Sequence, residues 1–313
     1  MDAQAGERLV SAATKGGVEI LVAPTVLYEA LRTPDEGLRE RLAKELTRPR
    51  WTRLMTEVYS ASMELLGEVQ RLRPGWLRSR PDLARFRQFR SDWTKAKGGF
   101  WDRARTSTAQ EWASLVQLGD PEVLRQAREQ AGARREEMKG REKWEHAPLP
   151  DLKVMPPGPR PGWRGDPVEP WRWDGLTEVS SALMQPRHAY RDWLEPYLDE
   201  QKVMADGPAW GAFWLYEVEA ANMPRFWTRW AVEYLQRFKK VTAGTPADGQ
   251  LATHLVEADV LLTEDKGLVD VIERARPFAP RSWGAAQVLR GNDVKGLLEL
   301  VAARGFDRGL ERG

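Results

Sequence analysis

Two aspartates and a threonine near the end of the chain occupy positions where parallel α/β proteins often do chemistry. Thr245, followed by a proline, is typical of the start of a helix, and Asp248 lies in the first turn of that helix. The apolar run 260–262 predicts a buried parallel strand, which Thr263 and Asp265 follow directly. Ligands of open parallel sheets gather outside the carboxyl ends of the strands, so Asp265 stands at a functional position and Asp248 is placed to face the same rim.

Asp248 also has a purely structural interpretation. An aspartate three residues after a threonine cap can complete a capping box, and it interacts favourably with the helix dipole without any catalysis. The residue types alone therefore leave both interpretations of Asp248 open.

The pattern from Asp248 to Asp265 resembles the carboxyl-terminal half of a PIN domain, in which an aspartate opens an apolar helix and a small strand leads into Thr-x-Asp. The stretch 18–31 is similar to the step from the second PIN strand into a helix with an acidic residue, and Glu29 takes that position. The resemblance covers about residues 1–34 and 245–290. It implies an α/β fold with a parallel sheet and flanking helices.

The first strand of a PIN domain, which lies in the middle of the sheet and ends in a metal-binding aspartate, has no evident counterpart in this sequence. Residues 4–15 already predict a short amphipathic helix, and Asp2 is the carboxylate nearest the expected position. The sequence leaves three explanations: a strand that precedes this sequence, a fold completed in another way, or a degenerate site.

The resemblance also implies a cofactor and a reaction. Glu29, Asp248 and Asp265 would hold Mg²⁺ or Mn²⁺, hard cations that prefer oxygen ligands. Such an ion lowers the pKa of a bound water and stabilises charge on a phosphate. Thr263 would hydrogen-bond near the scissile phosphate or orient a carboxylate. The resemblance therefore implies a metal-dependent endoribonuclease that hydrolyses phosphodiester bonds in single-stranded or structured RNA.

Several alternatives to this function stay open. DNA is an alternative substrate, because no residue in the pattern reports on the 2′-hydroxyl. Similar family members are toxins of bacterial toxin–antitoxin pairs, so the resemblance extends to a toxin or defence role and an inhibitory protein partner. A different class of function is a non-catalytic PIN-like protein that acts as a protein- or nucleic-acid-binding module.

Tryptophan marks a boundary within the chain, because fourteen of the fifteen tryptophans lie between Trp51 and Trp230. The sequence therefore predicts a discontinuous α/β domain formed by residues 1–34 and 245–313. A large, mostly α-helical, Trp-rich insertion occupies residues 35–244. Eight prolines without periodicity between residues 147 and 170 predict an extended linker inside it, which neighbouring tryptophans would pin to the body.

Basic residues are concentrated between residues 71 and 105, where eleven Lys or Arg residues face three aspartates and aromatic residues are interleaved. Such charges neutralise phosphates, and aromatic faces stack on unpaired bases. The spacing of Phe86, Phe89 and Trp93 also fits the buried face of an amphipathic helix. The basic residues are therefore better candidates than the rings for nucleic-acid contact, namely Arg85, Arg87, Arg90, Lys95 and Lys97.

Composition excludes some classes of site. The chain has no cysteine, so disulfides and thiolate chemistry are excluded, and its three histidines are too scattered to suggest a zinc site. No segment predicts a membrane span or a signal peptide, and we expect a cytoplasmic protein. The acidic helices after residue 176 are typical of solvated surface, and their charge also suits contact with the basic stretch, within the fold or across a homodimer.

Overall fold

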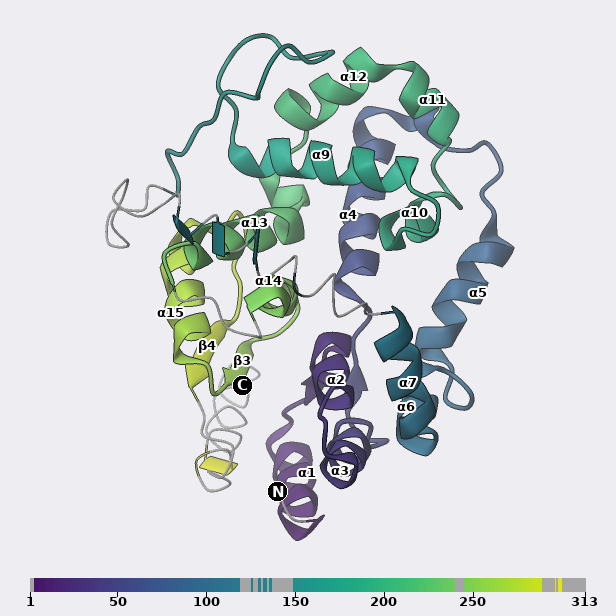
Figure 1. Cartoon of the computed structure of the whole chain (residues 1–313), viewed down its shortest axis with the longest axis vertical. Helices are drawn as coiled ribbons and strands as arrows, with labels where there is room; N and C mark the ends of the chain where they lie inside the picture. Colours follow the sequence, from purple (N-terminus) through teal and green to yellow (C-terminus); the bar gives the residue numbers. More distant parts are fainter. Residues whose placement is uncertain are drawn as a thin grey trace, which may run out of the picture.

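The computed structural model describes residues 3–118, 149–239 and 245–288, together with 125, 129–130, 132–133, 135–136, 296 and 298–299. Within this part the protein is mixed α/β and mostly helical (Figure 1). Strands β1 (Leu21–Val22) and β2 (Thr52–Arg53) pair in parallel, with Leu21 opposite Thr52. Strands β3 (Val260–Thr263) and β4 (Ala285–Val288) form a second parallel pair.

The two pairs are separate sheets in the described part of the chain, so the single sheet expected from the PIN resemblance is not seen there. Strand β2 lies within the range 35–244, which we assigned to the helical insertion. Strand β3 lies where the apolar run predicted it, but the prediction that it is fully buried is wrong: Val260 and Leu261 are half-buried and Leu262 is 37% exposed. Among the described residues, β4 alone pairs with β3.

The amino-terminal helices follow local signals in the sequence. Helix α1 (Ala3–Gly16) ends at Gly17, which has a φ of 62°. Helix α2 (Pro24–Leu31) begins with its proline at the first helical position and ends just before Thr33-Pro34, as predicted. In α3 (Glu36–Leu46), the carboxylate of Asp35 accepts a hydrogen bond from the N–H of Leu38 at 2.6 Å and caps the helix.

Helices account for most of the remaining described residues. Their bounds are α4 (Glu57–Leu72), α5 (Leu83–Thr94), α6 (Phe100–Thr106), α7 (Thr108–Leu118), α9 (Pro170–Met184), α10 (Ala189–Leu194), α11 (Glu200–Ala205), α12 (Gly207–Ala212), α13 (Pro224–Gln236), α14 (Thr245–Thr253) and α15 (Lys266–Ala275). Short 3₁₀ turns are η1 (Pro74–Trp76), η4 (Ala220–Asn222), η5 (His254–Val256) and η6 (Arg276–Phe278), and η3 (Phe213–Glu217) is a π-helical turn.

One large apolar core joins the helical body to the last α/β segment. It contains Leu65 of α4, Trp171 of α9 and Trp214 of η3, and also Leu255 and Ile272 from beyond residue 245. A smaller cluster beneath α2 joins residues of that helix to α3 and α6. The insertion therefore shares its hydrophobic core with the segment that carries Asp248 and Asp265.

The described part of the proline-rich linker is fixed to the body, as the neighbouring tryptophans predicted. Val154 and Val168 form an antiparallel bridge with backbone hydrogen bonds of 2.8 and 2.9 Å. The linker also approaches α12 closely, because a Cβ on Gly211 would lie 1.9 Å from the carbonyl oxygen of Pro161. Only glycine allows that backbone contact.

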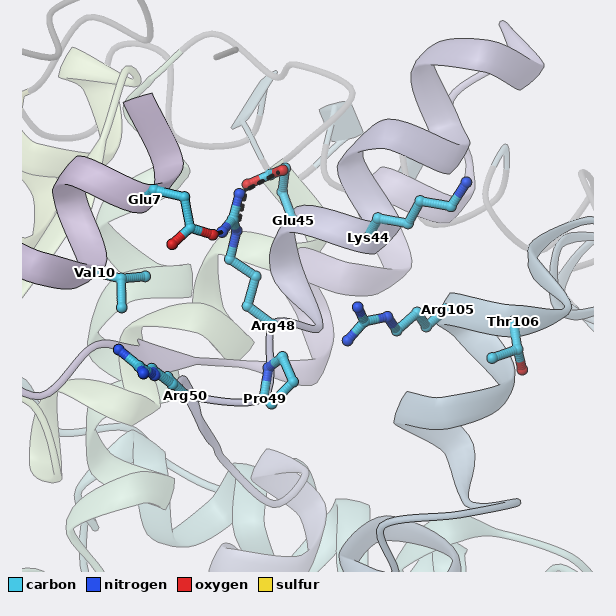
Figure 2. A pocket seen from close by; sticks show the side chains of 9 residues that line it. All are labelled: Glu7, Val10, Lys44, Glu45, Arg48, Pro49, Arg50, Arg105 and Thr106. Atoms are coloured by element: carbon cyan, nitrogen blue, oxygen red, sulfur yellow. Dashed lines mark hydrogen bonds and ion pairs between the residues drawn. The ribbon is translucent and has the colours of Figure 1, made fainter. Parts of the chain in front are cut away.

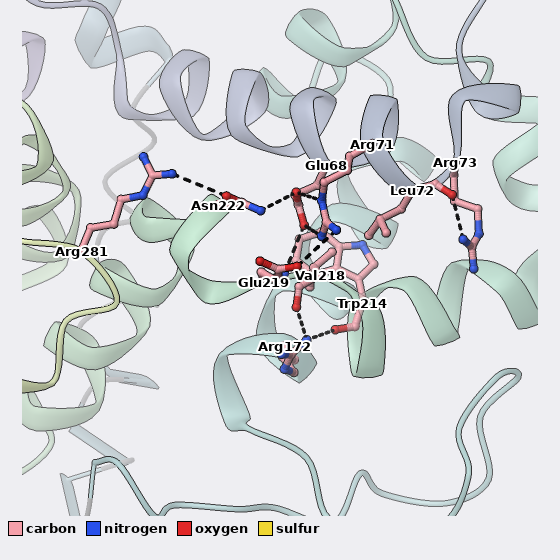
Figure 3. Close-up of polar contacts among 10 residues, drawn as sticks. All are labelled: Glu68, Arg71, Leu72, Arg73, Arg172, Trp214, Val218, Glu219, Asn222 and Arg281. Carbon is pink, nitrogen blue, oxygen red and sulfur yellow. Dashed lines mark hydrogen bonds and ion pairs between the residues drawn. The ribbon is translucent and has the colours of Figure 1, made fainter.

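A buried polar network ties α4 to the segment after η3 (Figure 3). Glu68, which is 2% exposed, accepts hydrogen bonds from Arg71 at 2.6 and 2.7 Å, from the N–H of Glu219 at 3.1 Å and from Asn222 at 3.0 Å. Burial acts to raise the pKa of Glu68, but these donors together outweigh it and lower the pKa. The ionised carboxylate thus holds two parts of the body together.

Within the described ranges, no helix has both the length and the apolar character needed to cross a membrane.

Candidate acidic site

Asp248 is placed by the packing of α14 against α13. A Cβ on Gly249 would lie 3.1 Å from Cγ of Glu233, so the two helices approach closely at this glycine. The Asp248 side chain is half-buried, and its Oδ2 accepts a hydrogen bond of 2.8 Å from the Nε2 of Gln236 in α13. The carboxyl group is therefore held at a helix interface with a single neutral donor recorded for it.

Asp265 follows β3 and caps the next helix. Its Oδ1 accepts a hydrogen bond from the N–H of Leu268 at 3.0 Å, which fixes the start of α15. The Asp265 N–H donates to Oγ1 of Thr263 at 3.1 Å. Thr263 thus orients the backbone of the residue that carries the second carboxylate. The residue as a whole is exposed.

Glu29 comes from the other side of the site. It lies in the second turn of α2, the helix that leads away from the carboxyl end of β1, and α2 packs against α14 (Figure 1). The residue is exposed, yet neighbouring groups partly screen the carboxyl from water and raise its pKa, while Arg32 acts to lower it.

The three carboxyl groups interact electrostatically. Burial, then the negative charges of Asp265 and Glu29, raise the pKa of Asp248 to about 7, and the Gln236 hydrogen bond only partly opposes this. Carboxylates from three separate segments therefore lie close enough for Asp265 and Glu29 to affect the ionisation of Asp248. Near neutral pH, Asp248 is divided between its protonated and ionised forms.

The oxygen-only donor set suits a hard divalent cation, and a cation would relieve the repulsion that raises the pKa of Asp248. Among the residues that the structure describes, no group of three or more acidic or histidine side chains lies close enough together to hold a metal ion. The three carboxylates therefore influence one another without closing around an ion in this arrangement.

The basic residues proposed for nucleic-acid contact lie on or just after α5. Arg85 is engaged within the fold, with its Nη2 2.8 Å from Oε2 of Glu195. Arg87, Arg90, Lys95 and Lys97 are exposed, and Lys95 lies 4.0 Å from Asp92.

The rings of α5 are half-buried and pack against other aromatic side chains. The centroid of Phe86 is 5.1 Å from that of Tyr197, and the centroid of Trp93 is 4.8 Å from that of Phe100. The alternative of an amphipathic helix with a packed aromatic face is confirmed for these rings, so nucleic-acid contact rests on the exposed basic side chains.

Two polar residues were not identified from the sequence. Gln236 lies in the predicted insertion, and no local pattern connects it with Asp248. Glu57, outside the acidic site, is the first residue of α4 in the segment that follows β2, and is 9% exposed; burial raises its pKa, while the charges of His254 and Arg229 act to lower it. Its position after a strand and next to the capping Thr56 is a signal that could have identified it.

His254 is buried, at 4% exposure, and its Nδ1 lies 3.5 Å from Oε2 of Glu257. Asp270 is exposed on α15, with its carboxylate 3.2 Å from Nζ of Lys239. Neither residue therefore belongs to the acidic site.

Comparison of the chain with protein-family models, with curated proteins and with solved structures found no match.

Proposed function

We propose that the protein is a PIN-type endoribonuclease that depends on Mg²⁺ or Mn²⁺. The observation that carries this proposal is the electrostatic effect of Asp265 and Glu29 on Asp248, whose pKa burial and these two charges together raise to about 7. Carboxylates that repel one another at the end of parallel strands are typical of a cation site. The strands β1 and β3, which lead to Glu29 and Asp265, are consistent with two parts of a PIN-like sheet.

In this proposal each residue has a defined task. Glu29, Asp248 and Asp265 would provide oxygen ligands to the cation, and Gln236 would hold Asp248 in a fixed orientation. A bound Mg²⁺ or Mn²⁺ supplies an activated water and stabilises negative charge on the phosphate. Thr263, through its bond to the Asp265 backbone, would keep the second carboxylate directed at the same point.

The decisive experiment is the cleavage of a labelled single-stranded RNA by the purified protein with Mn²⁺, compared with the Asp248→Asn and Asp265→Asn variants. Asp270→Asn is the matched control, because Asp270 is an exposed aspartate of α15 outside the acidic site. We expect the parent and the control to cut and the two site variants to be inactive. A matched single-stranded DNA distinguishes the two nucleic-acid substrates.

The second candidate is a non-catalytic module that binds protein or nucleic acid. It is favoured by the absence, among described residues, of three ligands close enough for a metal ion. If parent and variants are all inactive while RNA is still bound, this candidate replaces the nuclease. Equal cleavage by all four proteins indicates a contaminant and removes the support for the carboxylate assignment.

The proposed role as a toxin or defence protein, and the inhibitory partner it implies, rest on the PIN resemblance alone. The cleavage assay tests the activity that both require.

A further inference from the structure

A pocket of about 720 Å³ lies away from the acidic site, between α1, the end of α3, the loop before β2 and α6 (Figure 2). Four of its nine lining residues are cationic and two are anionic: Lys44, Arg48, Arg50 and Arg105 against Glu7 and Glu45. Its volume is in the range of sites that hold small ligands or part of a larger one.

The cations of this pocket differ in how far they are neutralised. Arg48 is fully engaged, with Nη1 2.6 Å from Glu7 and its Nε and Nη2 at 2.7 and 2.9 Å from the Glu45 carboxylate. Lys44 lies 3.4 Å from Glu40 at the exposed surface. Both acidic residues of the pocket form ion pairs with Arg48. The other two arginines, Arg50 and Arg105, therefore have no carboxylate partner among the residues that line the pocket.

Arg50 and Arg105 are the two free cations of the pocket among the residues that the structure describes. Arg50 is exposed and makes no ion pair with any of them, and the best contact of Arg105 is a 3.4 Å hydrogen bond from Nη1 to the carbonyl oxygen of Thr47. Figure 2 shows Arg105 reaching from α6 toward the loop that carries Pro49 and Arg50.

A third arginine increases the positive charge beside the pocket. Nη2 of Arg53 lies 3.5 Å from the same Thr47 carbonyl oxygen that Arg105 contacts. Burial, then repulsion from Arg105, lower the pKa of Arg53, while Asp102 acts to raise it. Two guanidinium groups that share one carbonyl oxygen and repel each other are better stabilised by an anion between or beside them.

The pocket and the acidic site lie at opposite ends of the β1–β2 pair. Residues 48–50 precede β2, so the pocket is at the amino end of that strand. Glu29 lies on the helix that follows β1, at the carboxyl end. The two strands are parallel, so the short pair separates a positive region from a negative one.

We propose that this pocket binds backbone phosphates of RNA through Arg50 and Arg105, as a second contact outside the acidic site. The choice of RNA rests on the proposed function, whereas the phosphate chemistry rests on the pocket itself. Guanidinium groups bind phosphate oxygens in pairs of hydrogen bonds, and the nearby Arg53 strengthens the local positive potential.

The test is the binding of a labelled single-stranded RNA, measured by fluorescence anisotropy at several salt concentrations without divalent ions. Arg50→Ala and Arg105→Ala are each expected to weaken binding roughly five- to tenfold and to lower the salt slope by about 0.7, the value for one phosphate contact on a single strand. Arg50→Lys and Arg105→Lys should recover part of the loss. Arg276→Ala is the matched control and should bind RNA like the parent. It removes an exposed positive charge on η6 that is paired with Glu273 of α15.

Unchanged thermal unfolding of each variant shows that a weakened affinity is not a folding defect. The inference is overturned if the two alanine variants bind RNA as tightly as the parent, if Arg276→Ala loses as much affinity, or if the parent binds no RNA. It is also overturned if inorganic phosphate binds through Arg50 and Arg105 but RNA does not, since the site then takes a free anion.

The result is separable from the nuclease test. If the parent does not cut RNA but the arginine variants bind it weakly, the nuclease proposal fails and the pocket stands. If cleavage depends on Asp265 and the arginine variants bind RNA normally, the pocket proposal fails and the nuclease proposal stands.

Discussion

Replacing Asp248 by asparagine should make the protein more stable at mildly alkaline pH while it abolishes cleavage. The structure gives the carboxyl a pKa of about 7, against 3.8 for an ordinary aspartate. A group whose pKa is higher in the folded protein stabilises it fully below the unfolded value, and this contribution is lost as pH rises through the folded value. The parent should therefore lose stability between about pH 4 and pH 7, and the asparagine variant should not.

The size of the effect follows from the same pKa. A difference of about three pH units corresponds to roughly 4 kcal/mol at 1.36 kcal/mol per unit, which is the upper limit. Glu29 and Asp265 are exposed, so water and salt screen their share of the repulsion. With that reduction we expect about 2 kcal/mol, or roughly 4 °C in Tm for a chain of this size.

The assay is thermal unfolding of the parent and of Asp248→Asn near pH 5 and near pH 8, with and without Mn²⁺. Near pH 5 the folded carboxyl is mostly protonated but the unfolded one is already ionised, so only part of the loss has occurred and the variant should have a smaller advantage than near pH 8. Near pH 8 and without metal, the variant should unfold at a higher temperature than the parent. Mn²⁺ should then raise the Tm of the parent and leave the variant nearly unchanged, because only the parent keeps all three carboxylates.

Asp270→Asn is the control for this experiment, since it removes the same charge from an exposed position. If the advantage of Asp248→Asn is equal at both pH values, the carboxyl does not titrate near neutrality and the electrostatic argument for the acidic site is wrong. If Mn²⁺ leaves the Tm of the parent unchanged, the proposal that the acidic site binds a divalent cation is wrong.

Three further changes test the packing around the site. Asp265→Ala should cost about 1 kcal/mol through the lost cap of α15, whereas Asp265→Asn keeps the cap; urea unfolding separates this loss from the loss of cleavage. Glu68→Ala removes the buried carboxylate to which Arg71, Asn222 and the Glu219 N–H donate, and should destabilise by about 2 kcal/mol in urea. The stability that Glu68 contributes to the parent should decrease in acid, as pH falls through its lowered pKa. Gly211→Ala forces a methyl group against the Pro161 carbonyl and should lower the free energy of unfolding by about 2 kcal/mol or more. Gly75→Ala is the control, because the space around Gly75 is open, and thermal unfolding should show a change within about 0.5 kcal/mol.

The parts of the fold that were predictable depend on local rules. The end of α2 before Thr33-Pro34 and the β3 strand after the helix of Asp248 follow from proline geometry and apolar runs. The placement of Asp265 just after a strand followed from the rule that ligands gather at the carboxyl ends of parallel strands, whereas Glu29 came from the PIN resemblance. Such rules need no knowledge of which distant residues are neighbours.

The parts that sequence analysis missed depend on distant partners. The bond from Gln236 to Asp248 and the ion pair between Arg85 and Glu195 join helices whose relative packing no local pattern encodes. The exposure of Leu262 has the same origin, because the burial of a strand depends on its neighbours in the sheet and not on its own residues.

The pKa of Asp248 also bears on the two interpretations that its sequence left open. An aspartate that only caps a helix is stabilised in its ionised form by the N–H groups and the dipole, so capping lowers its pKa. In the structure the opposite shift prevails, because burial, Asp265 and Glu29 together outweigh the Gln236 hydrogen bond. The Asp248 carboxyl is therefore costly to ionise in the folded protein as it stands. A bound cation would lower that cost, which is the electrostatic basis of the proposed metal-dependent function.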